Sequence, residues 1–295
     1  MRNSLILLLL LCSCTSTQTS KPVDLITPEK MLEEVTFLAS DAMQGRYYRS
    51  KEARIAANHI AETWKNAGLV PLPRQSSMYL LVDDVLASPN VAAMFKGSGS
   101  EYVLITAHYD HLKPRKSGKD KIYNGADDNA SGTAALLLIA DALSKLHTTP
   151  EASIVLVAFT GEEAGFVGSE HFASTAPIPM SQIRGLINLD MISRGEQNTI
   201  FLEGAPSAPR ISLAISRAND KVNLNIVKNR HPDWLYRSDQ APFLEQGVPS
   251  VFLSVEDHED YHRVTDHTEK IMPDLAAKTA QLTFLAAIDL AGGVP

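Results

Sequence analysis

The sequence predicts an α/β fold in which a mixed, mostly parallel and twisted sheet is covered by helices on both faces. Two observations lead to this prediction. Short runs rich in Val, Ile and Leu alternate with helical patterns, and nearly continuous apolar runs are typical of strands that are buried on both faces. The 295 residues are 44% hydrophobic and 21% charged, which is enough for one large domain with a substantial core.

The N-terminal segment lies outside the predicted domain. Residues 1–14, MRNSLILLLLLCSC, hold one basic residue and an apolar run too short to span a bilayer, which predicts a signal peptide. Within it, Leu11-Cys12-Ser13-Cys14 resembles a bacterial lipobox, so Cys14 would be the lipidated first residue of the mature chain. A plain signal peptide cut nearby is the alternative. We therefore expect an exported protein in the cell envelope, on the periplasmic or outer-membrane face, with a lipid anchor as its only membrane attachment.

The remaining elements follow in order. Residues 15–24 form a polar linker, and residues 25–295 form a single catalytic domain. Helical patterns cover 28–40 and 51–69, the second with Ala56, Ile60 and Trp64 on one face. Strands are expected within 101–110, 152–163, 185–193 and 248–257, and a buried helix follows GADDNASG at 125–132. A last helix covers 273–291, with Pro273 in its first turn.

Composition limits the chemistry that the chain can perform. Both cysteines lie in the leader, so the mature chain has no disulfide, no cysteine-ligated zinc and no cysteine nucleophile. A metal would have to be held by His, Asp and Glu. The net charge of -7 and the absence of a basic tract of five or more residues argue against a nucleic-acid partner.

Metal-ligand side chains follow every predicted strand. The strands run into AHYDH, TGEE, NLD and HEDYHRVTDH, and the carboxyl ends of parallel strands meet at one edge of a sheet. GADDNASG adds two adjacent carboxylates at the entry to a buried helix, where their charges are costly unless a cation is present. The pattern therefore predicts a metal site at this edge.

The segments AHYDH, GADDNASG, TGEEAGFVGS, INLDM and YHRVTD, in this order, resemble the two-zinc aminopeptidases of metallopeptidase family 28. LASDAMQGR followed by AANHIAETWKNAGL resembles the entry segment of exported bacterial members. The resemblance covers nearly the whole mature chain and implies a zinc-exopeptidase-like (phosphorylase/hydrolase-like) fold. Members often carry an inserted protease-associated domain, for which the interval between Leu69 and Glu101 is too short.

The resemblance implies a set of metal ligands. Asp128 would bridge two Zn²⁺ ions, and each ion would keep an open position, as catalytic zinc does. His and carboxylate ligands would also accept Co²⁺ or Mn²⁺. The family pattern further implies a cis peptide bond between Asp128 and Asn129, with Asp127 turned away to support the loop. Besides Asp128, one ion would be bound by His108 and Asp190, and the other ion by Glu163 and His262.

Three neighbouring residues receive supporting roles. Asp110 would accept the second imidazole N–H of His108 and fix its tautomer. Glu162 would act as general base on the metal-bridging water. Tyr261 would donate a hydrogen bond to the oxyanion, with a packing tyrosine as the equally weighted alternative.

The other histidines are expected to have no role in the chemistry. His111, His258 and His267 lie near the site but outside the matched positions, and His59, His147 and His171 are expected at the surface or in satisfied positions. Gln240 replaces a histidine that relatives often carry, which puts contacts on the substrate side in doubt.

The function that the resemblance implies is that of an exported zinc-dependent aminopeptidase, which hydrolyses N-terminal residues of peptide substrates through a metal-bridged hydroxide. Carboxypeptidase or dipeptidase activity on the same site is one alternative, and glutaminyl cyclisation, which similar folds perform with one zinc, is another. A non-catalytic binding protein is the least favoured reading, because all five ligands and Glu162 are present. Side-chain specificity and oligomeric state are not predicted.

Overall fold

The computed structural model describes residues 21–175 and 177–294, so the predicted leader with Cys14 lies outside the described residues. The fold begins slightly before the predicted boundary at residue 25. Pro22–Leu25 forms a short 3₁₀ helix, and Val23 packs against the main core. Gln281 Nε2 donates a hydrogen bond to Ile26 O at 2.8 Å, which ties this segment to the last helix. The last residues of the predicted linker therefore belong to the domain.

The sheet is mixed, as predicted, and its order is β1-β2-β4-β3-β5-β8-β6-β7. The four predicted strands correspond to β3, β4, β5 and β8, which lie side by side at the centre and are all parallel. Antiparallel pairs join β1 to β2, β2 to β4 and β6 to β8. The strand bounds are β1 (Tyr79–Leu80), β2 (Asn90–Phe95), β3 (Tyr102–His108), β4 (Ser153–Phe159), β5 (Ile183–Leu189), β6 (Thr199–Glu203), β7 (Asn225–Lys228) and β8 (Ser250–Ser254).

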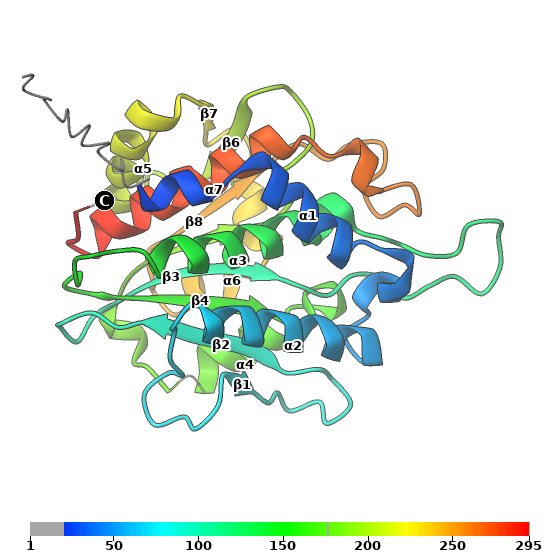
Figure 1. Ribbon diagram of the computed structural model, residues 1–295, viewed down its shortest axis with the longest axis horizontal. Helices are drawn as coiled ribbons and strands as arrows, with labels where there is room; N and C mark the ends of the chain where they lie inside the picture. Colours follow the sequence, from blue (N-terminus) through cyan, green and yellow to red (C-terminus); the bar gives the residue numbers. More distant parts are fainter. Residues whose placement is uncertain (1–20, 176, 295) are drawn as a thin grey trace, which may run out of the picture.

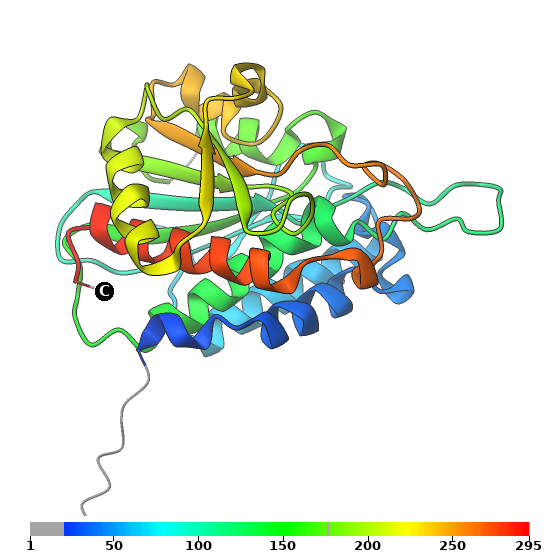
Figure 2. The same ribbon diagram turned by 90° about the horizontal axis from the view of Figure 1, so that it is seen from above.

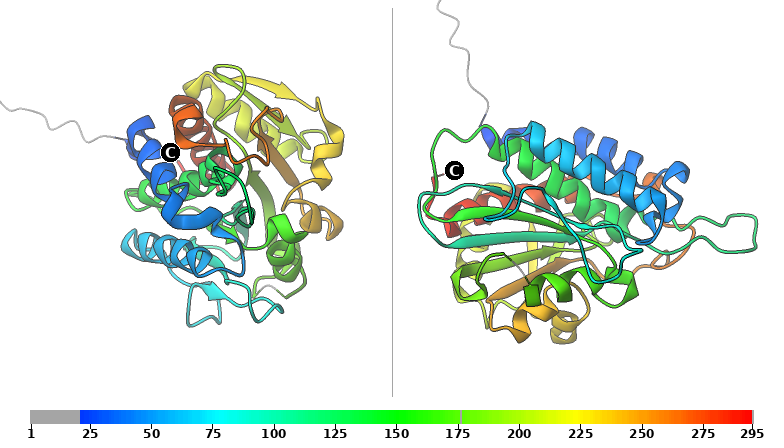
Figure 3. Two further views of the ribbon diagram at one scale, coloured as in Figure 1. Left: turned by 90° about the vertical axis from the view of Figure 1, so that its right-hand side faces the viewer. Right: turned by 90° about the horizontal axis from the view of Figure 1, so that it is seen from below.

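Helices cover both faces of the sheet (Figures 1 and 2). One face carries α1, α2, α3, α5 and α7, and the other carries α4 and α6, as the two views of Figure 3 also show. The predicted helices at 28–40, 51–69 and 273–291 correspond to α1, α2 and α7. The helix bounds are α1 (Pro28–Leu38), α2 (Lys51–Asn66), α3 (Gly132–Leu143), α4 (Val167–Thr175), α5 (Pro209–Val222), α6 (Ala241–Glu245) and α7 (Pro273–Leu290).

The central strands are buried on both sides because their side chains alternate between two apolar clusters. In β3, Val103 and Ile105 face the large cluster under α1, α2, α3 and α7. Leu104 faces the smaller cluster, where Phe172 of α4 and Phe243 of α6 pack. This packing holds the strand ends, and the loops that follow them, in fixed positions.

Local signals explain where the first helices begin. Thr27 Oγ1 accepts the N–H of Lys30 at the start of α1, and Ser50 Oγ accepts the N–H of Ala53 at the start of α2. The helix α3 is buried along nearly its whole length, since α2 and α7, which also pack on the sheet, flank it and α1 contacts it as well. Among the described residues, no helix combines the length and the apolar character needed to cross a membrane.

Candidate metal centre

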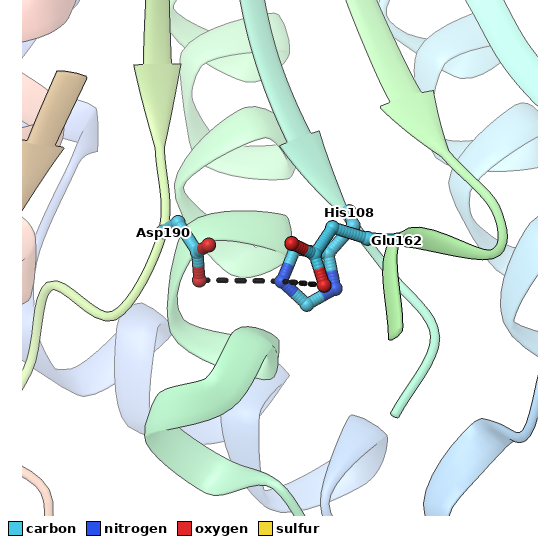
Figure 4. A group of neighbouring side chains, drawn as sticks. All are labelled: His108, Glu162 and Asp190. Carbon is cyan, nitrogen blue, oxygen red and sulfur yellow. Dashed lines mark hydrogen bonds and ion pairs between the residues drawn. The ribbon is translucent and has the colours of Figure 1, made fainter. Parts of the chain in front are cut away.

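The carboxyl ends of the central strands bring the predicted residues to one place. His108 is the last residue of β3, Asp190 follows β5 directly, and Glu162 begins the 3₁₀ turn after β4. Figure 4 shows these three side chains pointing toward one another from three different strands. The loop that follows β8 adds His262, and the loop before α3 adds Asp128.

Two groups of donor atoms form around two imidazoles. In the first group, His108 Nε2 lies 3.2 Å from Asp190 Oδ1 and 3.5 Å from Asp128 Oδ1. In the second group, His262 Nε2 lies 3.2 Å from Asp128 Oδ2 and 3.2 Å from Glu163 Oε2. Asp128 therefore directs one carboxylate oxygen to each group.

The spacing of these atoms fits two zinc ions. Two tetrahedral ligands at about 2.0–2.2 Å from one ion lie about 3.3 Å from each other. The four separations of 3.2, 3.5, 3.2 and 3.2 Å agree with shared ligation. Each group then has three protein donors, with Asp128 common to both.

His111 is a site residue that the sequence did not single out. Its Nδ1 lies 2.7 Å from Glu163 Oε1, which is a hydrogen-bond length and too short for two donors on one tetrahedral ion. His111 is fully buried and donates to one oxygen of Glu163, while Oε2, the other oxygen, faces His262. In the sequence, the only indication of its contact with Glu163 was its position three residues after His108 in AHYDH.

The electrostatics of the site show a need for positive charge. Burial alone would lower the pKa of His108, but Asp190 and Glu162 hold it well above its ordinary value. Burial likewise opposes protonation of His262, but Asp128 and Glu163 raise its pKa to about 10. Without metal, protons on these imidazoles supply the positive charge that the surrounding carboxylates require.

The two adjacent glutamates differ in environment. Burial raises the pKa of Glu162 well above its usual range. Burial would also raise the pKa of Glu163, but His111 and His262 hold it well below that range. Among the described residues, no side chain or backbone group donates a hydrogen bond to the carboxylate of Glu162, and its Oε2 lies 3.9 Å from His108 Nε2. Glu162 is therefore free to accept a proton, whereas Glu163 remains ionised.

The two aspartates of GADDNASG point in opposite directions, as expected. Asp127 Oδ1 accepts the N–H and the hydroxyl of Ser193 at 2.7 and 2.6 Å, and its Oδ2 lies 3.1 Å from His258 Nε2. The expected cis peptide bond between Asp128 and Asn129 is present. Asp127 thus joins the loop of Asp128 to the segment that leads to His262.

Gly125, at the start of this loop, has a φ of +58°. A Cβ atom there would lie 2.2 Å from Asp128 O and 2.6 Å from the ring of His111, so only glycine fits.

The prediction for Asp110 was wrong in one respect. His108 Nδ1 lies 3.1 Å from the backbone oxygen of Asp110, whereas its distance to the carboxylate is 3.8 Å. The chain turns after β3, so the carboxylate points toward β4, where Oδ1 accepts the N–H of Glu162 at 3.2 Å. Asp110 still fixes the imidazole of His108, through its carbonyl, and its side chain positions Glu162.

Arg46 supports the same region from outside the donor set. It is fully buried and donates hydrogen bonds to four backbone carbonyls. Two of these oxygens belong to Asn124 and Gly125, at the start of the loop that carries Asp128. A third belongs to Tyr109, which lies between His108 and Asp110 in the sequence. The fourth belongs to Leu38 at the end of α1. The segment QGR was part of the family resemblance, but its role became visible only in the structure.

Gln240 is fully buried, and its amide binds groups of the protein. Its Nε2 donates to the carbonyls of Trp234 and Leu235, and its Oε1 accepts from Asn188 on β5 at 2.8 Å. This buried amide thus joins the strand that carries Asp190 to the turn that carries Trp234, a residue that lines the cavity beside Asp190.

Tyr261 borders the site. Its ring stacks on His262, with centroids 4.0 Å apart. It also lines a small cavity of about 30 Å³ that opens beside Asp190. The other lining residues are Met191, Trp234, Arg237, Phe252, Ser254, Val255 and Asp257.

The remaining histidines take the positions expected or acquire a structural role. His59 pairs with Glu34, and His231 pairs with Glu256 and stacks on Trp234, with ring centroids 4.1 Å apart. His267 Nε2 lies 3.5 Å from Asp120. His258, which the sequence left without a role, is the partner of Asp127.

Comparison with known proteins identifies the sequence family. The model of peptidase family M28 matches residues 90–287, which include all five predicted ligands. A probable zinc metalloprotease of the fungus Leptosphaeria maculans is 27% identical over 240 residues, which cover 70% of this chain and 52% of the relative. The chain thus spans about half the length of the curated relatives it matches.

Solved structures share the fold. An aminopeptidase from Aneurinibacillus sp. strain AM-1 superposes with a TM-score of 0.72 at 15% identity, covering 92% of this chain and 96% of that one. A glutaminyl cyclase from Porphyromonas gingivalis gives a TM-score of 0.72 at 16% identity, covering 90% and 99%. The fold alone therefore does not distinguish these two reactions.

Proposed function

The chain belongs to peptidase family M28, and from this premise we propose that it is a zinc-dependent aminopeptidase with two zinc ions, which removes N-terminal residues from peptides. The observation that carries the proposal is the orientation of Asp128. Its two oxygens face different histidines, His108 and His262, at spacings that fit two neighbouring ions. This arrangement favours a two-ion hydrolase over a reaction that uses a single ion.

Zinc, when bound, would polarise the scissile carbonyl and lower the pKa of water at the site. Glu162 would take a proton from the attacking water as its oxygen adds to the carbonyl carbon, and would deliver that proton to the leaving amine as the C–N bond breaks. Asp110 holds the backbone of Glu162 in place. Burial raises the pKa of Glu162 above its usual range, which strengthens this carboxylate as a proton acceptor.

Tyr261 is proposed to donate its hydroxyl to the oxyanion that develops on the carbonyl oxygen. Its ring is fixed by stacking on His262, and burial, together with the surrounding carboxylates, raises its pKa, so the hydroxyl keeps its proton.

Glutaminyl cyclisation is the second candidate, because the cyclase from Porphyromonas gingivalis shares the fold over nearly its whole length. The two reactions leave different products. A cyclase releases ammonia from N-terminal glutamine without breaking the chain, whereas an aminopeptidase releases a free amino acid.

We also propose that the protein is exported and anchored through lipidation of Cys14. The support is the apolar leader and the Leu11-Cys12-Ser13-Cys14 pattern. Labelling cells with radioactive palmitate tests this directly. Label on the wild-type chain that disappears in Cys14→Ser is expected, and an unlabelled wild-type chain in the membrane fraction would refute lipidation.

The test of the reaction uses the soluble chain from residue 21 onward, loaded with zinc. We expect release of 4-nitroaniline from some members of a panel of aminoacyl 4-nitroanilides, loss of release with a chelator, and recovery with zinc. Ammonia release from N-terminal glutamine peptides without chain cleavage would favour the cyclase instead. No reaction with any anilide or short peptide would refute the aminopeptidase.

A further inference from the structure

A basic loop projects from the end of the molecule that carries the metal centre (Figures 1 and 2). We call residues 113–121, KPRKSGKDK, the basic loop. It leaves the site just after the buried His111 and returns at the buried Asn124, shortly before Asp128. Its residues are exposed except Pro114, which is half-buried. The loop is therefore continuous at both ends with the site.

The charge of this loop is opposite to that of the rest of the chain. It holds five basic residues and one acidic residue, a net charge of +4 in a chain whose net charge is -7. Among the described residues, no carboxylate forms an ion pair with any of the five, and Asp120 pairs with His267 at 3.5 Å. The five cations are Lys113, Arg115, Lys116, Lys119 and Lys121.

Hydrogen bonds and packing contacts hold the two ends of the loop in place. Arg46 binds the carbonyls of Asn124 and Gly125. Arg115 N donates to Lys121 O at 2.8 Å, which closes the loop as a hairpin, and the guanidinium of Arg115 lies 5.3 Å from the ring centroid of Tyr123. Gly45 packs against the two ends of the loop, where a Cβ atom would lie 2.5 Å from Leu112 O and 2.7 Å from Tyr123 O. The cations are thus displayed at a fixed edge of the site.

We propose that the basic loop binds acidic side chains of the peptide substrate, on the part that follows the bond to be cleaved. This inference rests on the proposed function and adds a substrate class to it: peptides with Asp or Glu a few residues after the N-terminus. The tip of the loop lies six residues beyond His111, a span of at most about 20 Å. An extended peptide covers that distance in about six residues, so carboxylates within roughly the first six positions after the cleaved bond come within reach.

The position of the loop favours a peptide over a membrane surface as its partner. The described chain begins at the opposite end of the molecule, where Lys21 precedes the 3₁₀ helix at Pro22–Leu25 (Figures 1 and 2). The proposed anchor at Cys14 would be joined to this end, so the loop lies at the opposite end of the molecule from the point of attachment. The loop stands instead at the end of the molecule where the metal centre lies, so a peptide bound there with its C-terminal part directed toward the loop comes within reach of the cations.

The test compares two peptides that differ only in charge, one with three glutamates at positions 4–6 and one with three glutamines there. For the wild-type chain, kcat/KM is expected to be about threefold to tenfold higher for the glutamate peptide at low ionic strength, as two or three exposed ion pairs would give. The preference should diminish as salt is added.

The variant is Lys116→Glu/Lys119→Glu, and the matched control is Lys65→Glu/Lys145→Glu, which makes the same change of charge at exposed positions outside the loop. The loop variant should lose or reverse the preference, while the control should keep it. All three proteins should hydrolyse an aminoacyl 4-nitroanilide at the same rate, because this small substrate does not reach the loop.

The outcomes separate the two proposals. Equal kcat/KM for the two peptides, with intact anilide hydrolysis, would overturn the role of the loop and leave the aminopeptidase standing. If no substrate were hydrolysed, the proposed function would fail, and fluorescence anisotropy of the labelled glutamate peptide would still test the loop, with binding expected in the control and lost in the loop variant. Loop-dependent binding to phosphatidylserine vesicles without a peptide preference would also overturn the proposal.

Discussion

Hydrogen-bond lengths and ligand spacings separate the roles of residues that lie side by side in the metal centre. His262 and His111 both approach Glu163, but at 3.2 and 2.7 Å, so one fits as a fellow ligand and the other as a hydrogen-bond donor. The sequence could bring the five proposed ligands to one place because each lies at the end of a parallel strand or in a matched loop. It could not give the direction of His111 or Asp110, because the alternation of a strand no longer applies once the chain turns after His108.

Glu162→Gln tests the general base. The variant should bind both zinc ions, since Glu162 is not among the ligands, and should lose on the order of a hundredfold or more in kcat. Metal analysis and steady-state kinetics on one preparation check both parts. Turnover at the wild-type rate would contradict the assigned role.

His111→Ala tests whether His111 positions Glu163. Without the imidazole, Glu163 loses its hydrogen bond at Oε1, so the affinity of the second group for zinc should fall about 10- to 100-fold. The first group, around His108, should be affected much less. Competition with a chelator indicator resolves the two affinities, and His147→Ala, at an exposed position, is the control. Two unchanged affinities would show that the contact has no influence on metal binding.

At the scale of elements, the centre of the sheet was predictable and its edges were not. β3, β4, β5 and β8 are long or nearly continuous apolar runs, so each was identified from the sequence. β1 has two residues and β7 has four, with exposed or half-buried side chains, so neither carries a clear pattern. The helix α5 does carry one, with Ile211, Ala214, Ile215 and Ala218 spaced for burial, and this part of the fold could have been predicted.

Arg46 joins three elements, and its removal should affect all of them. Arg46→Leu would leave the buried carbonyls of Tyr109, Asn124 and Leu38 without their Arg46 donor, while that of Gly125 would keep only the N–H of Ala130. We expect the free energy of unfolding to fall by about 3 kcal/mol or more, because each buried unsatisfied group costs about 1–3 kcal/mol. Urea unfolding measures this difference.

The matched control for Arg46 is Arg54→Leu. Arg54 is exposed and makes one hydrogen bond, to Leu86 O. Its loss should cost no more than about 1 kcal/mol. Equal effects of the two substitutions would contradict the role given to Arg46.

At the scale of the whole molecule, the metal centre is where distant parts of the chain meet. The proposed ligands come from β3, from the loop before α3, and from the segments that follow β4, β5 and β8, so bound zinc would cross-link segments between residues 108 and 262. The order of elements along the chain indicated this convergence, because parallel strands bring their carboxyl ends together. The sequence alone did not show that the metal centre and the first described residues lie at opposite ends of the molecule.

Removing the metal should therefore destabilise the entire domain. Ligands that bind only the folded state add stability that grows with their concentration, about 2.7 kcal/mol at a hundred times Kd. A chelator should lower the Tm, and added zinc should restore it, for Glu162→Gln as well as for the wild type. A Tm that does not change with chelator would mean that zinc does not bind in the folded core.

The most direct test of the central claim, that Asp128 is shared by two ions, is the zinc content per chain of the wild type and of Asp128→Ala, measured after dialysis against buffered zinc. Two ions in the wild type, and weakened binding of both in the variant, are predicted. One ion in the wild type, retained in Asp128→Ala, would contradict the two-ion centre and the aminopeptidase mechanism built on it.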